Sequence, residues 1–247
     1  MEKRRIEVAR DDGMANGMQY FPDGDGPFPL VLSFTDIGGV RPAMEQMAEP
    51  LVAAGYAVVQ PNVYWREGEF EPFDFSTVWG DPDERKRLMA LAGTVKRERT
   101  MADARAFVAA TVADPRVRGA QIGCVGYCMG GRLTFIAAAD LADLVVAGAS
   151  IHGGRLVTDQ PDSPHLSASE IRASMYFGVA EGDSSCTAED CEVLEQVLTE
   201  AGVGHRIEVY EGVKHGWSVP DFPVYDAEAS ARQWQRVLTL FDEHLHG

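Results

Sequence analysis

Short apolar runs alternate with segments of helical periodicity along most of the chain. Short apolar runs bounded by turn residues indicate buried strands, which we predict at 30–34, 56–60, 121–125, 145–151, 175–179 and 206–210. Helical spacing of apolar residues predicts helices at 42–54, 100–112, 129–139, from Thr187 to near Gly202, and at 225–245. Strands that alternate with helices predict the α/β class, with a mostly parallel central sheet and helices on both faces.

Two segments depart from this alternation. Residues 6–21 have the pattern of a β-hairpin that precedes the first buried strand. Residues 64–99 are rich in aromatic and charged residues with little clear period, and two interpretations stay open for them. The segment is either a lid over the edge of the sheet or a surface loop that packs its own aromatic side chains. No internal repeat or linker stands out, so residues 1–247 are predicted to form a single domain.

The charge of the chain limits its partners. Its 247 residues carry a formal net charge of −16, and no basic cluster is interleaved with aromatic residues. Phosphate groups would be repelled, so we expect neither nucleic acid nor an anionic membrane as a partner. We expect a small-molecule substrate, and a monomer or small homo-oligomer. A strongly anionic substrate would need local basic residues to overcome the overall field.

The four cysteines and the first residues indicate a reducing compartment. The N-terminal MEKRRIEVARDDG lacks the apolar region of a signal peptide, and no apolar stretch approaches the length of a membrane span. We therefore expect a cytoplasmic protein with reduced thiols. Cys186 and Cys191 are wrongly spaced for a zinc site, and no histidine pair has metal-site spacing. We expect neither a metal nor a cofactor.

A glycine-flanked cysteine follows the predicted strand at 121–125. Gly126-x-Cys128-x-Gly130 lies between this strand and a predicted helix, which is the context of a nucleophile elbow with cysteine in place of serine. Small neighbours permit a strained turn, and the N-terminus of the following helix favours an anion there. The alternative is a buried structural cysteine, for which Cys124, inside the strand, is the better candidate. We predict that Cys128 is a nucleophile.

A thiol nucleophile needs a base, and the base needs an orienting acid. In this type of fold the order along the chain is nucleophile, acid, histidine. His215 follows the last predicted strand and precedes the last helix, so it is the predicted base. The acid should follow the strand at 175–179, where Asp183 is the first choice and Glu181 the alternative.

The other histidines have weaker claims. His244 and His246 lie near the end of the last helix, His205 starts a strand, and His165 has no clear place in the fold. His152 follows the strand at 145–151 and therefore faces the same edge of the sheet. It either lines the substrate pocket or is a hydrogen-bonded structural residue.

An acyl-transfer site also needs donors for the developing oxyanion. The first predicted donor is the backbone N–H of Met129, directly after the nucleophile. The second is the N–H of Ile37, in the loop that follows the strand at 30–34. The paired glycines after Ile37 let that backbone approach closely.

Four motifs together resemble the dienelactone hydrolase family of α/β-hydrolases over nearly the whole chain. They are GYCMGG at 126–131, TDIGGV at 35–40, GYAVVQPNVY at 55–64 and KHGW at 214–217. The resemblance implies an α/β-hydrolase fold. It also implies a Cys–His–Asp triad, carried onto Cys128, His215 and Asp183.

The resemblance implies further site residues. A glutamate of the family's oxyanion loop contacts the resting thiol, and Asp36, one methylene shorter, stands at that position. Family members that act on dienelactones hold the substrate carboxylate with two arginines, of which one matches Arg87. The second is absent after His215, where Trp217-Ser-Val stands. Trp217 and the aromatic residues of 64–79 therefore indicate a more apolar pocket than that of a dienelactone enzyme.

The predicted function is hydrolysis of small esters or lactones through a thioester acyl-enzyme on Cys128. One alternative is a thioesterase or an activated-ester hydrolase that uses the same site. The other is a non-catalytic protein in which Cys128 acts as a redox-sensing thiol.

Overall fold

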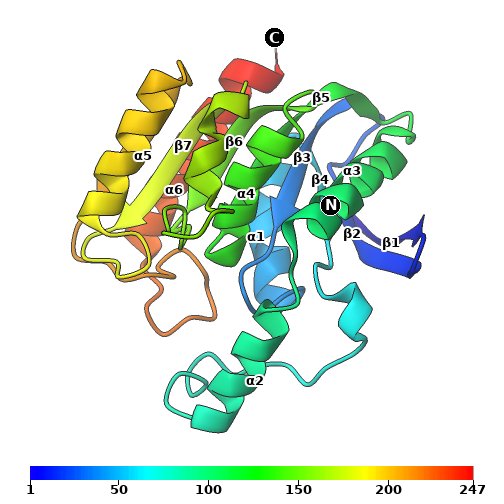
Figure 1. Ribbon diagram of the computed structural model, residues 1–247. Coiled ribbons are helices and arrows are strands. Elements are labelled where there is room, and N and C mark those ends of the chain that lie inside the picture. The colour runs from blue at the N-terminus through cyan, green and yellow to red at the C-terminus, as the bar shows by residue number, and fades with distance from the viewer. Residues whose placement is uncertain (247) are drawn as a thin grey trace.

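An eight-stranded sheet forms the centre of the structure (Figure 1), with its strands in the order β1-β2-β4-β3-β5-β6-β7-β8. The computed structural model describes residues 1–246, except for the side chains of residues 119 and 120, so residue 247 of the predicted domain lies outside the described residues. β1 and β2 form an antiparallel hairpin, β2 pairs antiparallel with β4, and the remaining strands are parallel. The strands are β1 (Glu2–Arg10), β2 (Gly13–Phe21), β3 (Phe28–Phe34), β4 (Ala57–Pro61), β5 (Val117–Tyr127), β6 (Val145–Ile151), β7 (Ser174–Ala180) and β8 (His205–Tyr210).

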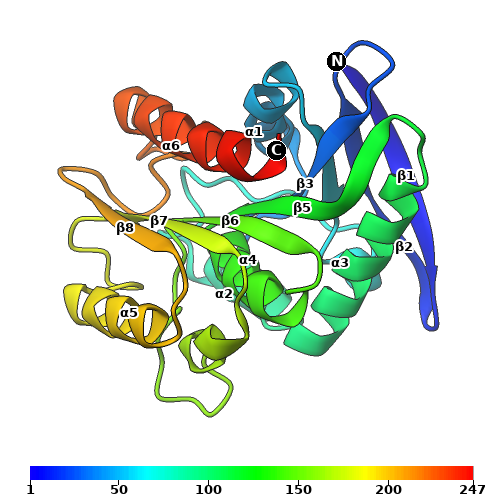
Figure 2. The ribbon, with the colours of Figure 1, turned by 90° about the horizontal axis from the view of Figure 1, so that it is seen from above.

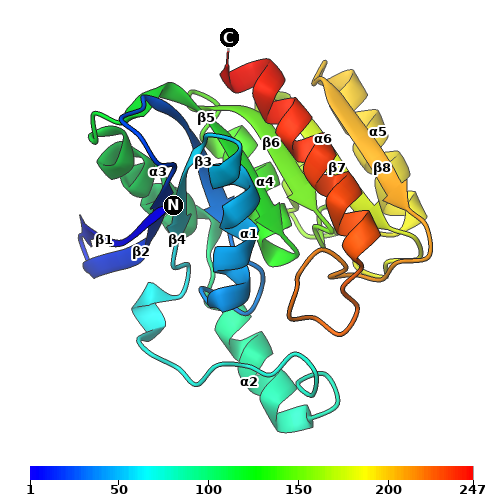
Figure 3. The ribbon, with the colours of Figure 1, turned by 180° about the vertical axis from the view of Figure 1, so that it is seen from behind.

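Helices cover both faces of the sheet (Figure 2, Figure 3). One face carries α1 (Pro42–Ala53) and α6 (Ala227–Leu245), and the other carries α3 (Arg97–Val112), α4 (Met129–Asp140) and α5 (Ala188–Glu200). Alternate side chains of a strand point to opposite faces. Leu30 and Leu32 therefore belong to the core under α3 and α4, while Val31 belongs to the core under α1 and α6. Among the described residues, no helix has the length and hydrophobicity that crossing a lipid bilayer requires.

The elements predicted from the apolar pattern are all present, including the N-terminal hairpin. The predicted α/β class, with a mostly parallel sheet and helices on both faces, is confirmed. The largest differences are at the starts of β1, α3 and β5, which begin earlier than predicted. The first residues of β1 and α3, Glu2-Lys-Arg-Arg5 and Arg97-Glu-Arg99, carry polar side chains. In β5, Arg118 and Gly119 separate Val117 from the apolar run that starts at Ile122, so the apolar pattern does not reach the true starts.

The 64–99 segment contains a helix that the pattern did not predict, α2 (Pro82–Ala92), after a short 3₁₀ turn, η1 (Trp65–Glu67). Leu88 is the one buried residue of α2, so the helix has almost no apolar period to detect. Its start signal is nevertheless present, because the Asp81 side chain accepts hydrogen bonds from the N–H groups of Asp83 and Glu84. A second 3₁₀ segment, η2 (Pro164–Glu170), was also not predicted.

The parallel strands bring distant loops to one edge of the sheet. The segments that leave β3, β5, β6, β7 and β8 all emerge at the carboxyl edge, because the carboxyl ends of parallel strands lie on the same side. α2 lies beyond this edge, below the sheet in Figure 1. The residues predicted to do chemistry follow these strands, so the fold gathers them at the place where open α/β sheets bind ligands.

The start of α5 gives a test of how much a local motif contributes to this fold. The Thr187 hydroxyl accepts from the N–H of Asp190 (3.2 Å), and the Asp190 carboxylate accepts from the N–H of Thr187 (2.9 Å). We expect Thr187→Ala to lower the free energy of unfolding by about 1 kcal/mol, because the variant loses the acceptor for a helix N–H. Urea denaturation followed by circular dichroism checks this, with Thr187→Ser as the control that keeps the hydroxyl. Equal midpoints for the alanine variant and the wild type would contradict the prediction.

Candidate active site

Cys128 lies on the sharp turn between β5 and α4 and has strained backbone angles. Its φ is 55° and its ψ is −114°, in a region that residues with a Cβ rarely adopt. A Cβ on Gly126 would lie 2.1 Å from the carbonyl oxygen of Gly130, and a Cβ on Gly130 would lie 2.4 Å from the carbonyl oxygen of Thr35. Glycine at both positions therefore permits the close approach of β5, α4 and the loop after β3.

His215 and Asp183 meet in front of this turn. The Nδ1 atom of His215, in the loop after β8, lies 2.7 Å from Oδ2 of Asp183, in the loop after β7. Glu181, the other candidate acid, instead accepts a hydrogen bond from the N–H of Gly212 (3.1 Å). Ser185, which the sequence analysis did not single out, donates through its hydroxyl to Asp183 (2.7 Å) and lies 3.2 Å from Nδ1 of His215.

The charge state of His215 depends on these neighbours and on Cys128. Burial disfavours the imidazolium, but the Cys128 sulfur and the Asp183 carboxylate outweigh burial and raise the pKa of His215 to about 10. Burial opposes the charge of Asp183 as well, yet its hydrogen bonds with His215 and Ser185 lower the pKa of this carboxyl group. The arrangement can therefore hold a proton on His215 at neutral pH.

The two predicted oxyanion donors lie close to the nucleophile. Met129 is the first residue of α4, Ile37 lies in the loop after β3, and both line the same cavity as Cys128. Neither N–H donates a hydrogen bond to another residue of the described chain. Tyr64 connects the two, because its buried hydroxyl donates to the Ile37 carbonyl (2.8 Å) and lies 3.6 Å from the Met129 sulfur. The sequence analysis did not identify Tyr64.

Asp36 is engaged by an arginine. Its buried carboxylate accepts two hydrogen bonds from Arg41 (2.6 and 2.7 Å) and one from the N–H of Gly38 (2.8 Å). Arg41 also binds Asp221, in the loop that precedes α6 (2.7 and 2.9 Å). Burial opposes the charge of Arg41, but the hydrogen bonds to Asp221 and Asp36 outweigh it and raise the pKa of the guanidinium. No hydrogen bond joins Asp36 to Cys128 within residues 1–246.

His152 and Trp217 lie behind His215, outside the cavity lining. His152 is fully buried, accepts the N–H of Cys128 at Nδ1 (3.1 Å) and places Nε2 2.8 Å from the Ser218 hydroxyl. Its ring centroid is 5.1 Å from that of His215. Trp217, also fully buried, stacks on Tyr210 and meets His152 edge-on, with centroids 4.8 and 4.9 Å apart. The position of His152 fits the interpretation of a hydrogen-bonded structural residue.

Arg87 also lies outside the lining of the Cys128 cavity. Its guanidinium binds Glu84 (2.6 and 3.0 Å) and the carbonyl of Glu71 (2.8 Å), and it lies 3.8 Å above the ring of Phe73. Thus the structure brings Cys128, His215, Asp183, Met129 and Ile37 together but leaves Arg87 within its own segment.

A cavity of about 1030 Å³ opens in front of Cys128. One part of its wall is apolar and comes mainly from the 64–99 segment and the loop before α6, with Phe75, Trp79, Met89, Val95, Phe222 and Val224. The rings of Phe75 and Phe222 pack with centroids 4.4 Å apart and join the two segments. Charged residues also line the cavity: Lys96, Arg132, Arg155, Asp183 and Lys214. The 64–99 segment thus forms part of the wall around Cys128.

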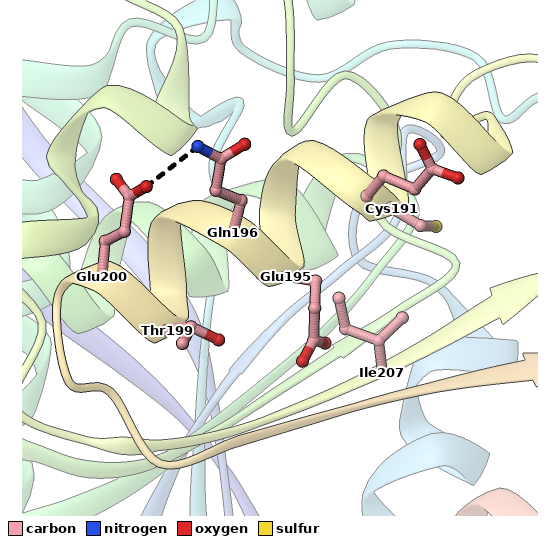
Figure 4. A pocket seen from close by; sticks show the side chains of 7 residues that line it. Cys191, Glu195, Gln196, Thr199, Glu200 and Ile207 are labelled. Atoms are coloured by element: carbon pink, nitrogen blue, oxygen red, sulfur yellow. Dashed lines mark hydrogen bonds between the residues drawn. The ribbon is translucent and has the colours of Figure 1, made fainter.

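A second hollow, of about 560 Å³, lies along α5 and β8, away from Cys128 (Figure 4). Its lining includes Cys191, Ile207 and three glutamates, Glu192, Glu195 and Glu200. Gln196 donates to Glu200 (2.9 Å) along the helix. Cys186 and Cys191 are free thiols, and no group of three metal-binding side chains occurs among residues 1–246.

Comparison with known proteins finds one family over most of the chain. Residues 16–245 match the family model described as "Dienelactone hydrolase family". A protein of Synechocystis sp. named "Putative carboxymethylenebutenolidase" is 29% identical over 228 residues, which cover 91% of this chain and 89% of that protein. A "Carboxymethylenebutenolidase" of Pseudomonas sp. is 33% identical over 118 residues, which cover 47% of this chain and 46% of that protein.

Solved structures show the same fold. A structure titled "Putative Dienelactone Hydrolase" from Klebsiella pneumoniae superposes with a TM-score of 0.82 at 22% identity and covers 99% of this chain and 100% of its own. A dienelactone hydrolase-like promiscuous phosphotriesterase from metagenomic libraries gives a TM-score of 0.75 at 22% identity, with 99% of both chains covered. At this identity the likeness concerns the fold alone, and it confirms the predicted α/β-hydrolase fold.

The ion pairs of Arg41 give a prediction for stability. Arg41→Gln would leave the buried carboxylate of Asp36 without its charged partner, so we expect the free energy of unfolding to fall by about 3 kcal/mol. Asp221→Asn removes the outer carboxylate, which is 40% exposed, and should cost less than about 1 kcal/mol. Chemical denaturation of both variants measures the difference. Equal losses in the two variants would contradict the assignment of Asp36 as the critical partner.

Proposed function

This chain belongs to the dienelactone hydrolase family and is a hydrolase, and we propose that it cleaves small carboxylic esters or lactones with Cys128 as the nucleophile. The observation that carries the proposal is the hydrogen bond of 2.7 Å between Asp183 and His215, which line the same cavity as Cys128. A nucleophile, a base and an orienting acid in this order are the requirements for acyl transfer through a covalent intermediate.

Acylation begins from the state in which His215 holds the proton of the Cys128 thiol. The sulfur attacks the carbonyl carbon of the ester, and the electron pair of the C=O bond moves to the oxygen. The N–H groups of Met129 and Ile37 stabilise this oxyanion. When the tetrahedral intermediate collapses, the C–O bond to the leaving group breaks, and the leaving alkoxide takes the proton from His215. The acyl group remains on the sulfur as a thioester.

Deacylation uses the same groups with water as the nucleophile. His215 takes a proton from a water molecule, which attacks the thioester carbonyl. The C–S bond then breaks, the carboxylic acid leaves, and the proton on His215 returns to the sulfur. Asp183 and Ser185 keep Nδ1 of His215 directed away from the sulfur, so that Nε2 serves in both steps. In a lactone the leaving group stays attached to the acyl chain, and the product is a hydroxy acid.

A thioesterase would use the same atoms, with a thiolate as the leaving group. A panel with one acyl group as neutral ester, lactone and thioester separates these substrates by kcat/KM. The redox-sensing role of Cys128 has less support, because the chain belongs to an enzyme family and His215 with Asp183 stands beside the sulfur.

The nucleophile can be tested with p-nitrophenyl butyrate. We expect Cys128→Ala to lower kcat/KM by at least about a thousandfold, because no acyl-enzyme can form. Cys191→Ala is the matched control, since it removes a thiol outside the cavity, and it should retain activity near that of the wild type. Mass spectrometry of the quenched wild-type reaction should find the butyryl group on Cys128. Undiminished hydrolysis by Cys128→Ala would refute the proposed mechanism.

The pKa of His215 sets the alkaline limit of activity. Since this pKa is raised to about 10, the imidazolium that protonates the leaving group persists through neutral pH and is lost as the pH rises through about 10. The pH profile of kcat/KM should therefore fall on its alkaline side near pH 10. Asp183→Asn removes a charge that raises this pKa, so the alkaline limb should move to lower pH. Glu181→Gln is the comparison, and a shift in that variant alone would assign the acid to Glu181.

A further inference from the structure

Two cysteines meet at the start of α5, in the segment that follows the acid of the site. The Sγ atoms of Cys186 and Cys191 lie 3.9 Å apart, within reach of a weak S–H···S hydrogen bond, and both residues are free thiols. Cys124 differs, because its sulfur contacts the Thr134 hydroxyl (3.6 Å) and burial raises its pKa to about 12. Cys186 and Cys191 are therefore placed where their sulfur atoms can react with each other.

The capping box of α5 brings these two thiols together. Thr187 is the N-cap and Asp190 is the third helical residue. Cys186 therefore directly precedes the cap, and Cys191 is the fourth residue of the helix. Side chains at these two positions commonly pack against each other at the start of a helix, and any pair of apolar side chains would serve for that packing. Two thiols add a chemical possibility, which is a covalent bond across the start of the helix.

The two thiols differ in exposure and in acidity. Cys191 is half-buried and lines the hollow along α5 (Figure 4), whereas Cys186 is buried. The hydrogen bond from Cys186 lowers the pKa of Cys191, against burial and the charges of Asp190 and Asp183, which raise it. The same hydrogen bond first, and burial second, raise the pKa of Cys186. Cys191 is therefore the thiol that loses its proton and meets a solute, and Cys186 is the thiol behind it.

The loop between β7 and α5 joins this pair to the candidate active site. The N–H of Cys186 donates to the carbonyl of Asp183 (3.2 Å), which closes a tight turn. Ser185, directly before Cys186, donates from its N–H and from its hydroxyl to the Asp183 carboxylate (2.8 and 2.7 Å). A movement of Cys186 would therefore be transmitted through this turn to the carboxylate that binds His215.

A bond between the two sulfur atoms requires this loop to move. The atoms must approach from 3.9 Å to about 2 Å. The helix holds Cys191 in place, because its N–H donates to the Thr187 carbonyl (3.0 Å) and the buried leucines of α5 anchor the helix in the core. Cys186 lies on the loop, so most of the approach falls to Cys186 and to the turn that carries Asp183.

We propose that Cys186 and Cys191 form a reversible oxidation site, at which a peroxide converts the two thiols into a disulfide that displaces Asp183 and slows hydrolysis. The formation of the disulfide is independent of the proposed function. Its effect on hydrolysis rests on the role proposed there for Asp183. The hollow along α5 gives the peroxide access to Cys191 on the side of the sheet edge away from the Cys128 cavity.

The oxidation proceeds in two balanced steps with hydrogen peroxide as the oxidant. The Cys191 thiolate attacks one oxygen of the peroxide, the O–O bond breaks, and the leaving hydroxide takes up a proton as water, which leaves Cys191 as a sulfenic acid. The Cys186 sulfur then attacks the sulfur of the sulfenic acid. The S–O bond breaks, and the hydroxide leaves with the proton of Cys186 as a second water. A dithiol reductant returns both thiols by exchange.

Mass spectrometry tests the oxidation in the Cys128→Ala protein, which lacks the thiol of the cavity. Hydrogen peroxide in slight excess should yield the disulfide, and alkylation of the denatured protein should then modify neither Cys186 nor Cys191. Cleavage after Glu189 separates the two cysteines, so the disulfide should appear as two joined peptides that dithiothreitol releases. With Cys186→Ala in addition, Cys191 should carry oxygen as a sulfenic or sulfinic acid instead. Full alkylation of both cysteines after the treatment would overturn the proposal.

The effect on hydrolysis is measured with p-nitrophenyl butyrate in the protein that retains Cys128. Peroxide also oxidises Cys128, so kcat/KM is expressed per molecule with an unmodified Cys128, counted by mass spectrometry. We expect this value to fall by about tenfold to a hundredfold in the oxidised wild type, since a displacement of about 1 Å can have an effect of that size. Dithiothreitol should restore it. Cys191→Ala is the matched control, which should keep its value under the same treatment.

The pH profile identifies the cause of the loss. Asp183 raises the pKa of His215, so a displaced Asp183 should move the alkaline limb of kcat/KM to lower pH in the oxidised wild type. Oxidation of Cys128 removes active molecules and leaves the profile of the others unchanged. A disulfide that changes neither kcat/KM nor this limb would overturn the proposal.

Failure of this inference differs from failure of the catalytic proposal. Absence of the disulfide, together with hydrolysis that depends on Cys128, would overturn the oxidation site alone. Hydrolysis that survives Cys128→Ala would overturn the catalytic proposal and would leave the formation of the disulfide unaffected, because that bond is measured without turnover.

Discussion

The left-handed turn at Cys128 is the constraint on which the site depends. A residue with a Cβ in such a conformation costs on the order of 1–3 kcal/mol, so its surroundings must hold it. Ile151 and His152 both accept the N–H of Cys128 (3.0 and 3.1 Å), and the N–H of Arg132 donates to its carbonyl. The turn fixes where the sulfur stands, where the N–H of Met129 points and where α4 begins. The missing side chains of Gly126 and Gly130 give this turn its space.

Arg41 organises the rest of the cavity around this turn. Its guanidinium binds Asp36, beside Ile37, and Asp221, in the loop before α6. The same group lies 4.7 Å from the ring centre of Phe75 and 5.6 Å from that of Phe222. One side chain thus connects the loop after β3, the 64–99 segment and the loop before α6. Asp36, the shorter acid at this position, binds the Arg41 side chain that makes these contacts.

The sequence predicted the positions of site residues where these positions follow from the order of the strands in the sheet. Parallel strands end at one edge, so the order Cys128, Asp183, His215 along the chain was enough to predict that these residues meet. The contacts that Ser185, Tyr64 and Arg41 make at that edge could not be predicted. They depend on the directions of side chains in loops, and those directions are set only when the loops pack together. The sequence left Asp183 and Glu181 open as the acid for the same reason. Chain order allowed both, and only the hydrogen bond to Nδ1 distinguishes them.

The adjacent imidazoles of His152 and His215 have different surroundings, and these determine which of the two rings can take up a proton. His152 receives an N–H at Nδ1, so its single hydrogen resides on Nε2 and is directed to Ser218. A second proton on this ring would sit on Nδ1, which would then no longer accept the N–H of Cys128. Burial and the charge of His215 also lower the pKa of His152 well below its ordinary value. The ring behind His215 therefore stays neutral, and of these two imidazoles His215 is the one that can hold a second proton.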